Sequence, residues 1–289
     1  MNNQQSIIDN QFPIVFFGTG KYVLPILETL KSSYEIPLVL TTEKSDSEPV
    51  SKFAQENGIK LISVAKFDED VDSEIKKTGA EVAVLAYFGM ILPKQILKLF
   101  PKGIINVHPS LLPKYRGPTP GQTALLNGDK TTGVSIIRLD QEVDHGPILV
   151  QQEVEILPND TASTLYERLF KIGSQILAKT LPKYLSGKLK STEQGHSKAT
   201  LTKTLMRDSG FIDIASPPAV EEIENMIKAY FPWPGVWTKA TINNKLSIIK
   251  FLPERRIQVE GGKPMSYKDF LNGYPKLQPE LVGLLEKLQ

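Results

Sequence analysis

The chain has 289 residues, 40% of them hydrophobic, and a formal net charge of +2. This length and hydrophobic content suffice for one large or two ordinary domains and argue against disorder. It contains no cysteine and three histidines, which excludes disulfides, thiolate metal sites and a thiol nucleophile and argues against a zinc centre. The sequence has neither an apolar run of about 18 residues nor the charged-then-apolar start of a signal peptide, so we expect a cytoplasmic protein.

Short apolar runs alternate with segments of helical periodicity along the first half of the chain. Residues 13–17 form the first run, and the Gly-Thr-Gly that follows leads into apolar residues at helical spacing over 22–30. This Gly-Thr-Gly lacks the third glycine of a dinucleotide fingerprint and the lysine of a P-loop, so we interpret it as a tight turn. Further strands are expected at 36–41, 60–64, 81–86 and 103–107, with helices at 50–57 and 71–78. Strands that alternate with helices predict right-handed crossovers and a Rossmann-like parallel sheet in an α/β domain.

The strand at 103–107 leads into a candidate site. Asn106 and His108 lie two residues apart, so an extended strand places both on one face. Open α/β sheets bind ligands at the carboxyl ends of their strands. The side-chain amide of Asn106 can donate to the oxygen on which negative charge develops when a nucleophile attacks a carbonyl group. His108 can donate to the same oxygen or move a proton.

Asp144 completes this set of candidate catalytic residues. It lies in the loop 140–146, after a further strand expected at 133–139, and this loop leads back toward His108. Its carboxylate can orient the imidazole and accept a proton that an attacking nucleophile must lose. Each of the three residues has a common structural interpretation by itself, as a strand-end histidine or a turn residue. Together they can manage an acyl transfer without a serine or cysteine nucleophile, whereas His145 is assigned no role.

The remainder of the chain predicts a linker and a second domain. An outer strand at 148–157 and a long helix at 162–185 end the first domain, 1–188, and a basic stretch with glycine and serine, 189–206, is interpreted as a linker. The C-terminal domain, 207–289, combines a helix, an aromatic turn and short strands. This pattern suits a smaller, mainly β domain of the oligonucleotide-binding (OB-like) type, reduced in its number of strands.

The predicted C-terminal domain carries an excess of basic residues that the net charge of the whole chain hides. Candidates for contacts with nucleic-acid phosphates are Lys245, Lys250, Arg255 and Arg256. An ordinary solvated surface is the alternative interpretation of these residues.

Two blocks of sequence around the candidate site resemble a known family. Residues 106–117, NVHPSLLPKYRG, and residues 143–146, VDHG, follow the pattern N-x-H-x-S-L-L-P-x-x-R-G and then D-x-G of the folate-dependent formyltransferases. Residues 231–238, FPWPGVWT, and 263–273, KPMSYKDFLNG, resemble the C-terminal part of the methionyl-tRNA formyltransferases within that family. The resemblance spans nearly the whole chain.

The resemblance implies transfer of the formyl group of 10-formyltetrahydrofolate to the α-amine of initiator methionyl-tRNA in translation initiation, with no metal. It implies catalytic roles for Asn106, His108 and Asp144. For Arg116 we expect either a role in orienting the substrate or a purely structural role. Folate contacts are implied for two loops, at Ser110, Leu111, Leu112 and Pro113 and at Phe88, Gly89, Met90, Ile91 and Leu92. We expect a monomer without a membrane partner.

One segment departs from the family. Methionyl-tRNA formyltransferases usually carry a long basic loop after the second strand. The corresponding loop here, residues 41–50, is shorter, and its sequence, TTEKSDSEPV, is mostly acidic or polar. The acceptor therefore stays open between the tRNA, an amino sugar nucleotide and, as in a formyltetrahydrofolate hydrolase, water. The non-enzyme alternative is an RNA- or nucleotide-binding protein on a degenerate formyltransferase fold, and the intact Asn106, His108 and Asp144 argue against it.

Overall fold

The computed structural model describes residues 12–42 and 48–288. Part of the short loop after the second strand, residues 43–47, lies outside the described residues. The chain divides into two compact units. The N-terminal unit consists of Met1–Pro118, Thr132–Glu155 and Tyr166–Thr202, and the C-terminal unit consists of Thr119–Thr131, Ile156–Leu165 and Lys203–Gln289. The predicted domain boundaries after residues 188 and 206 stay a prediction.

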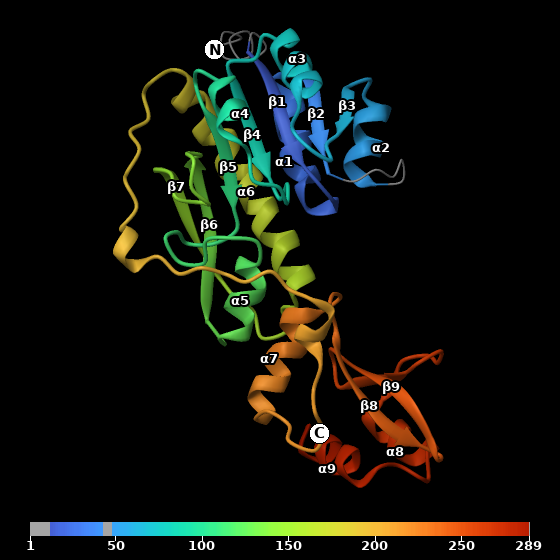
Figure 1. Ribbon diagram of the computed structural model, residues 1–289. Coiled ribbons are helices and arrows are strands. Elements are labelled where there is room, and N and C mark those ends of the chain that lie inside the picture. Colours follow the sequence, from blue (N-terminus) through green and yellow to red (C-terminus); the bar gives the residue numbers. More distant parts are fainter. Residues whose placement is uncertain (1–11, 43–47, 289) are drawn as a thin grey trace, which may run out of the picture. The chain divides into compact units, whose positions relative to one another are not determined.

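A seven-stranded sheet forms the centre of the N-terminal unit, in the order β3-β2-β1-β4-β5-β6-β7 (Figure 1). The pairs from β3 to β5 are parallel, and β6 runs antiparallel to β5. The strands are β1 (Pro13–Gly18), β2 (Glu35–Thr41), β3 (Lys60–Ser63), β4 (Val82–Ala86), β5 (Ile104–His108), β6 (Thr131–Arg138) and β7 (Ile148–Glu155). The predicted Rossmann-like α/β fold is therefore confirmed, with a mixed sheet in place of a fully parallel one.

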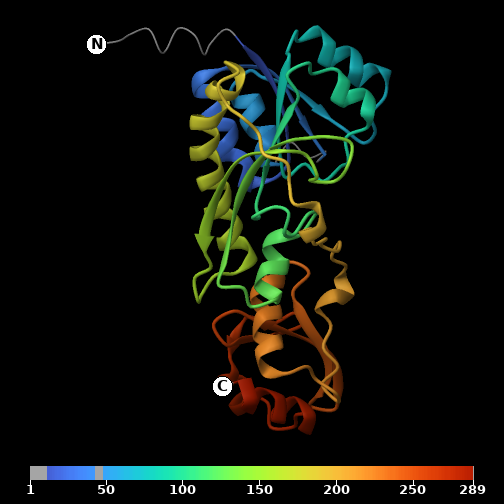
Figure 2. The same cartoon turned by 90° about the vertical axis from the view of Figure 1, so that its left-hand side faces the viewer.

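Helices cover both faces of this sheet. Figure 2 separates α1 and α6 on one side from α3 and α4 on the other. The helices of the unit are α1 (Leu24–Ser33), α2 (Pro49–Glu56), α3 (Glu69–Lys77), α4 (Lys94–Lys98) and most of α6 (Ala162–Leu185). Since both faces are covered, the central strands are built from nearly continuous apolar residues, and every residue of β4 and β5 is buried. No helix within residues 12–42 and 48–288 is both long and apolar enough to cross a membrane.

The alternation of side chains along β5 decides which helices each residue meets. Ile104 packs in the core that contains Ile75 of α3 and Ile96 of α4. Val107 points to the opposite face, where α6 comes so close that a Cβ on Gly173 would lie 2.7 Å from the Val107 side chain. Asn106 and His108 follow Ile104 at intervals of two, so they share its face at the carboxyl end of the strand.

Polar groups of the Gly-Thr-Gly turn after β1 form hydrogen bonds with side chains of the same chain. The backbone N–H of Gly20 donates to Oε1 of Glu48 at 2.6 Å, and the other carboxylate oxygen of Glu48 accepts from the N–H of Ser51 in the first turn of α2. The hydroxyl of Thr19 contacts that of Thr41 at the end of β2. These contacts fit a structural turn that joins β1, β2 and α2.

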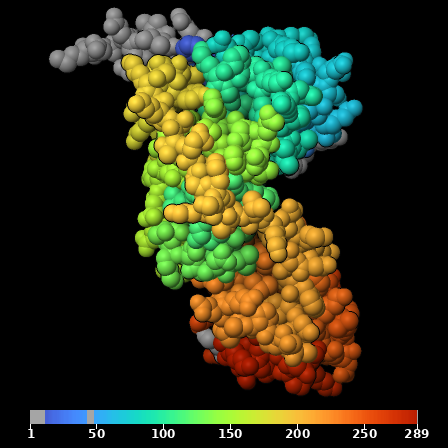
Figure 3. All heavy atoms as spheres, turned by 60° about the vertical axis from the view of Figure 1, so that its left-hand side comes forward, coloured from blue at the N-terminus to red at the C-terminus, as the bar shows by residue number. Residues whose placement is uncertain are grey.

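Residues 190–202, which fall within the predicted linker, pack on the N-terminal unit. Thr192 and Ile148 exchange two backbone hydrogen bonds of 2.8 Å, and Thr200 and Thr202 pair with the backbone of Arg116. In Figure 3 this stretch runs as a gold band across the green surface of the unit. We call residues 190–202 the strap.

The C-terminal unit contains a second, smaller sheet. Its four strands, in the order β11-β10-β9-β8, are all antiparallel. The elements are α5 (Pro120–Leu126), α7 (Val220–Tyr230), β8 (Val236–Ile242), β9 (Lys245–Leu252), β10 (Arg256–Val259), β11 (Met265–Ser266), α8 (Tyr267–Gly273) and α9 (Pro279–Leu288). Alternate residues of β8 are buried, as a sheet with one covered face requires. The predicted small β domain with a reduced number of strands is confirmed.

Candidate active site

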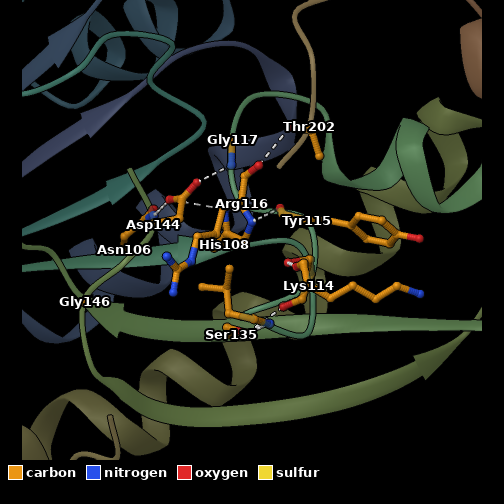
Figure 4. Close-up of polar contacts among 12 residues, drawn as sticks. Asn106, His108, Lys114, Tyr115, Arg116, Gly117, Ser135, Asp144, Gly146 and Thr202 are labelled. Atoms are coloured by element: carbon orange, nitrogen blue, oxygen red, sulfur yellow. Dashed lines mark hydrogen bonds and ion pairs between the residues drawn. The ribbon is translucent and has the colours of Figure 1, made fainter. Parts of the chain in front are cut away.

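The three residues that the sequence singled out lie in contact (Figure 4). Nδ2 of Asn106 donates to Oδ1 of Asp144 at 3.0 Å, and Nδ1 of His108 lies 3.5 Å from the same oxygen. The other carboxylate oxygen, Oδ2, accepts from the backbone N–H of Gly117 at 2.8 Å. The carboxylate of Asp144 therefore joins β5, the loop after it and the loop after β6.

Both side chains from β5 are almost fully buried. Asn106 is 5% exposed and His108 is 4% exposed, whereas the Asp144 side chain is 12% exposed. Nε2 of His108 lies 2.9 Å from the carbonyl oxygen of Tyr115. Since a carbonyl can only accept, this nitrogen carries a hydrogen, and Nδ1 is the nitrogen that faces Asp144.

The glycines near Asp144 are required by space and by backbone conformation. A Cβ on Gly146 would lie 1.9 Å from the carbonyl oxygen of Arg138, so no side chain fits there. Gly117 has φ +107°, and a Cβ there would lie 2.7 Å from the hydroxyl of Thr202. Asp144 itself has φ 48°, an uncommon conformation for a residue other than glycine. These restrictions explain why glycine follows arginine in one motif and stands two residues after aspartate in the other.

Two side chains from β6 and β7 hold the loop that is predicted to contact folate, residues 110–113. The hydroxyl of Ser135 on β6 donates to the carbonyl of Ser110 at 2.6 Å and accepts from the N–H of Leu112 at 3.0 Å. Nε2 of Gln151 on β7 donates to the carbonyl of Leu112 and to the Ser135 hydroxyl, both at 2.8 Å. Ser110 and Leu112 are buried, while Leu111 and Pro113 are half-buried.

In the second loop predicted to contact folate, residues 88–92, some side chains lie in the core and others at the surface. Phe88 and Leu92 are buried in the core, where Phe88 meets Phe17 edge to face with ring centroids 5.4 Å apart. Ile91 is 74% exposed, and Gly89 is exposed as well, while Met90 is half-buried. Burial raises the pKa of the Tyr87 hydroxyl just before this loop, and the nearby Tyr22 adds to the effect.

The side chain of Arg116 contacts two residues of the strap within the N-terminal unit, Gln194 and His196. It is 6% exposed, and its Nε and Nη2 donate to Oε1 of Gln194 at 3.1 and 2.7 Å. Its Nη2 also lies 2.9 Å from Nδ1 of His196. The ring of His196 stacks on that of His145, with centroids 4.0 Å apart, and Nδ1 of His145 contacts Oδ2 of Asp140 at 2.6 Å. The sequence interpretation missed Gln194 and His196 because a single polar residue in a polar stretch has no periodic pattern.

The four basic residues singled out in the C-terminal unit are all exposed. Lys250 pairs across the sheet with Trp237 and Gln258, and Arg256 pairs with Leu252. Since side chains alternate along a strand, Lys250, Arg256 and Lys239 share the outer face of the sheet. Lys245 begins β9, and Arg255 lies in the turn before β10 with φ 55°.

No group of three or more histidine, cysteine, aspartate or glutamate side chains that could hold a metal ion occurs among the residues the structure describes.

Comparisons with known proteins agree with the fold and with the motifs. The family model described as formyl transferase matches residues 26–181. A methionyl-tRNA formyltransferase of Carboxydothermus hydrogenoformans is 34% identical, over 92% of this chain and 98% of the relative. The solved structure of a 4-N formyltransferase from Francisella tularensis matches with a TM-score of 0.68 at 18% identity, over 84% of this chain and 98% of that one.

A solved N-formyltransferase from Helicobacter canadensis, in complex with folinic acid and dTDP-3-aminofucose, has the same fold. It matches with a TM-score of 0.60 at 20% identity, over 89% of this chain and 99% of that one. At these identities the two solved structures bear on the fold alone. The family model covers more than half of the chain and the sequence relative covers nearly all of it, so this chain belongs to the formyl transferase family, and within it resembles the methionyl-tRNA formyltransferases.

Proposed function

We propose that this protein transfers the formyl group of 10-formyltetrahydrofolate to the α-amino group of initiator methionyl-tRNA, the formylation that serves translation initiation. The observation that supports it most is the carboxylate of Asp144, which binds Asn106 and lies beside His108 at the carboxyl end of β5. The similarity to a relative named for this reaction extends over both units of the chain. That extent favours methionyl-tRNA over an amino sugar nucleotide as the acceptor.

Asn106 is proposed to stabilise the negative charge of the transition state. An asparagine amide carries two hydrogens, and one of those on Asn106 is donated to Asp144. The second can point at the formyl oxygen, on which charge develops as the amine attacks. A donor of this kind typically contributes about 2.7–4 kcal/mol to lowering the barrier. Its bond to Asp144 holds the amide in place, so little reorganisation is needed during the reaction.

His108 and Asp144 are proposed to manage the protons. The amine nitrogen forms a bond to the formyl carbon, the bond from that carbon to N10 of the folate breaks, and the proton lost by the amine ends on N10. Since Nε2 of His108 is bonded to Tyr115, Nδ1 is the nitrogen that can exchange a proton or donate to the developing oxyanion. Asp144 accepts the amine proton directly or through water, and it also orients the imidazole.

The remaining predicted contacts surround this centre. The loop 110–113, held by Ser135 and Gln151, and the loop 88–92 are proposed to bind the folate. The bonds of Arg116 to Gln194 and His196 favour a structural role for its guanidinium over a direct contact with the substrate. Lys245, Lys250, Arg255 and Arg256 are proposed to contact tRNA phosphates.

The experiment that tests the proposed function offers three acceptors in parallel. Purified protein is given 10-formyltetrahydrofolate with methionyl-tRNA, with an amino sugar nucleotide, or with buffer alone, and the release of tetrahydrofolate is followed. We expect turnover with methionyl-tRNA and formyl-methionyl-tRNA as the product. Turnover without an acceptor would identify a hydrolase, and turnover with the amino sugar alone would identify a sugar formyltransferase; either result contradicts the proposal.

A further inference from the structure

Gln194 of the strap lies at the centre of the contacts that hold Asp144. Its side chain is buried, with 4% of the residue exposed, although it stands among exposed neighbours in a stretch of polar sequence. We infer that Gln194 is a positioning residue: through its side-chain amide it sets the place of the Asp144 carboxylate. This inference rests on the catalytic role proposed for Asp144.

Both ends of the Gln194 amide are engaged. Its Nε2 donates to the backbone carbonyl of Asp144 at 2.8 Å and to that of Gly146 at 2.7 Å. Its Oε1 accepts from Nε and Nη2 of Arg116. A guanidinium can only donate and a carbonyl can only accept, so the chemistry of the partners fixes the orientation of the amide. A glutamine is therefore the one neutral side chain of this length that satisfies both partners.

The segment that contains Arg116, a partner of Gln194, also contacts the carboxylate of Asp144. Arg116 precedes Gly117, and the backbone N–H of Gly117 donates to Oδ2 of Asp144. Gln194 thus holds the main chain of Asp144 on one side and, through Arg116, the donor to its side chain on the other. The φ of 48° at Asp144 is an uncommon conformation that persists only where the surroundings impose it. The bonds from Gln194 to the carbonyls of Asp144 and Gly146 supply that restraint.

The strap that carries Gln194 is itself fixed on both sides of this residue. Before it, Thr192 and Ile148 exchange two backbone hydrogen bonds. After it, His196 stacks on His145, and Thr200 accepts from the N–H of Arg116 at 2.9 Å. The strap therefore keeps contacts with the N-terminal unit that do not involve the Gln194 side chain. A substitution of Gln194 can move the loop 140–146 while the strap stays in place.

Loss of the Gln194 amide should act on the chemical step more than on binding. A misplacement of about 1 Å in a catalytic group costs up to roughly 100-fold in rate. We expect Gln194→Leu, which keeps the size and removes both donor and acceptor, to lower kcat by roughly 10- to 100-fold with little change in the KM for folate. Glu193→Ala is the matched control, since Glu193 is the exposed neighbour in the same strap.

A second variant separates the two ends of the amide. Gln194→Glu keeps an acceptor for Arg116 but places an oxygen where Nε2 now faces the carbonyls of Asp144 and Gly146. If Gln194 works by holding the loop 140–146, Gln194→Glu loses kcat as Gln194→Leu does. Wild-type kcat in Gln194→Glu would overturn the inference, because it would mean that only the contact with Arg116 matters.

A double-mutant cycle with Asp144→Asn distinguishes positioning from a general effect on the fold. If Gln194 acts through the carboxylate of Asp144, adding Gln194→Leu to Asp144→Asn should cause no further loss of kcat. If the two losses multiply, with circular dichroism unchanged, the inference is wrong.

A spectroscopic readout keeps this test independent of the proposed function. The chain has three histidines, so the ring ¹⁵N signals of His108 can be assigned with His145 and His196 variants. Gln194→Leu should shift the His108 ring signals, Glu193→Ala should not, and Gln194→Leu should add no shift in the Asp144→Asn background. Signals that stay unchanged in Gln194→Leu overturn the inference. Absent formyl transfer with shifted His108 signals would refute the proposed function and leave the positioning role of Gln194 supported.

Discussion

Each oxygen of the Asp144 carboxylate is bonded to a different segment of the chain. Oδ1 accepts from Asn106 on β5 and lies beside His108, while Oδ2 accepts from the backbone of Gly117. An ionised carboxylate has about four acceptor sites, so these contacts leave room for one more donor. Under the proposed mechanism the attacking amine is that donor, so the carboxylate of Asp144 both organises the site and takes a proton from the substrate.

The role of Asn106 can be tested by removing its amide. If Asn106 stabilises an oxyanion that exists only in the transition state, Asn106→Ala should lower kcat by about 10²–10³ with little effect on folate affinity. Steady-state kinetics and a separate folate-binding titration measure the two quantities. A variant that loses folate affinity and kcat in equal measure would show that Asn106 shapes the binding loop instead.

The coupling between His108 and Asp144 can be measured with a double-mutant cycle. Asp144→Asn keeps the size of the side chain but removes its charge, and His108→Ala removes the imidazole. Because the two are proposed to act as a unit, the double variant should be no slower than the slower single variant. Losses of kcat that multiply, in variants whose circular dichroism is unchanged, would mean that Asp144 works independently of His108.

At the scale of elements, the loop 140–146 depends on close backbone packing. A methyl group at Gly146 would lie 1.9 Å from the carbonyl oxygen of Arg138, so the loop or the end of β6 must move to accept it. We expect Gly146→Ala to reduce kcat and to lower the thermal stability of the protein. Gly195→Ala is the control, because a Cβ at Gly195 would meet no atom within 4 Å. Equal activity of the two variants would show that this loop tolerates displacement without effect on the site.

The small sheet of the C-terminal unit arranges its basic side chains by strand alternation. Lys250 and Arg256 share one face, and both are exposed. If they contact tRNA phosphates, Lys250→Ala with Arg256→Ala should raise the KM for methionyl-tRNA and reduce the slope of its salt dependence by about two. The KM for folate should not change.

The control variant for this prediction removes two positive charges from the N-terminal unit instead of the small sheet. Lys76→Ala with Lys98→Ala changes two exposed lysines of the N-terminal unit. An unchanged salt slope in the Lys250 and Arg256 variant, or an equal change in the control, would identify the basic face as an ordinary solvated surface.

At the scale of the whole molecule, the buried phenol of Tyr267 makes the free energy of unfolding depend on pH at high pH. Tyr267 is 3% exposed, and burial raises the pKa of its hydroxyl to about 12. The stabilising contribution of the neutral phenol is fully present below pH 10, the ordinary value, and is lost as the pH rises toward 12. Relative to Tyr267→Phe, the wild type should lose about 1 kcal/mol of unfolding free energy between pH 9 and pH 11.

Denaturant unfolding of the full chain at the two pH values measures this difference. Tyr267→Phe is its own control, because phenylalanine packs similarly and cannot ionise. Parallel pH dependence of the wild type and Tyr267→Phe would show that the hydroxyl of Tyr267 ionises as readily in the folded protein as in the unfolded chain.

The sequence by itself determined most elements of the N-terminal unit, though not the short helix α4, and the candidate catalytic residues. Buried strands such as β4 and helices such as α6 follow from apolar runs and helical periodicity, which are local properties of the chain. The interval of two between Asn106 and His108 placed them on one face of a strand for the same reason. The motif around them then predicted Asp144 as their partner, and the structure brings the three together.

Only the tertiary structure decided which distant segments complete the site. The sequence predicted a linker where the strap packs, because contacts between residues far apart leave no periodic signal in a polar stretch. Gln194 is buried by its bonds to Arg116, Asp144 and Gly146, which lie about 50 to 80 positions away. The antiparallel pairing of β6 with β5 is likewise set by the strand partner and not by the composition of either strand. Local patterns specify elements, whereas the contacts of Gln194 with the loop 140–146 are specified by three segments that meet only in the folded protein.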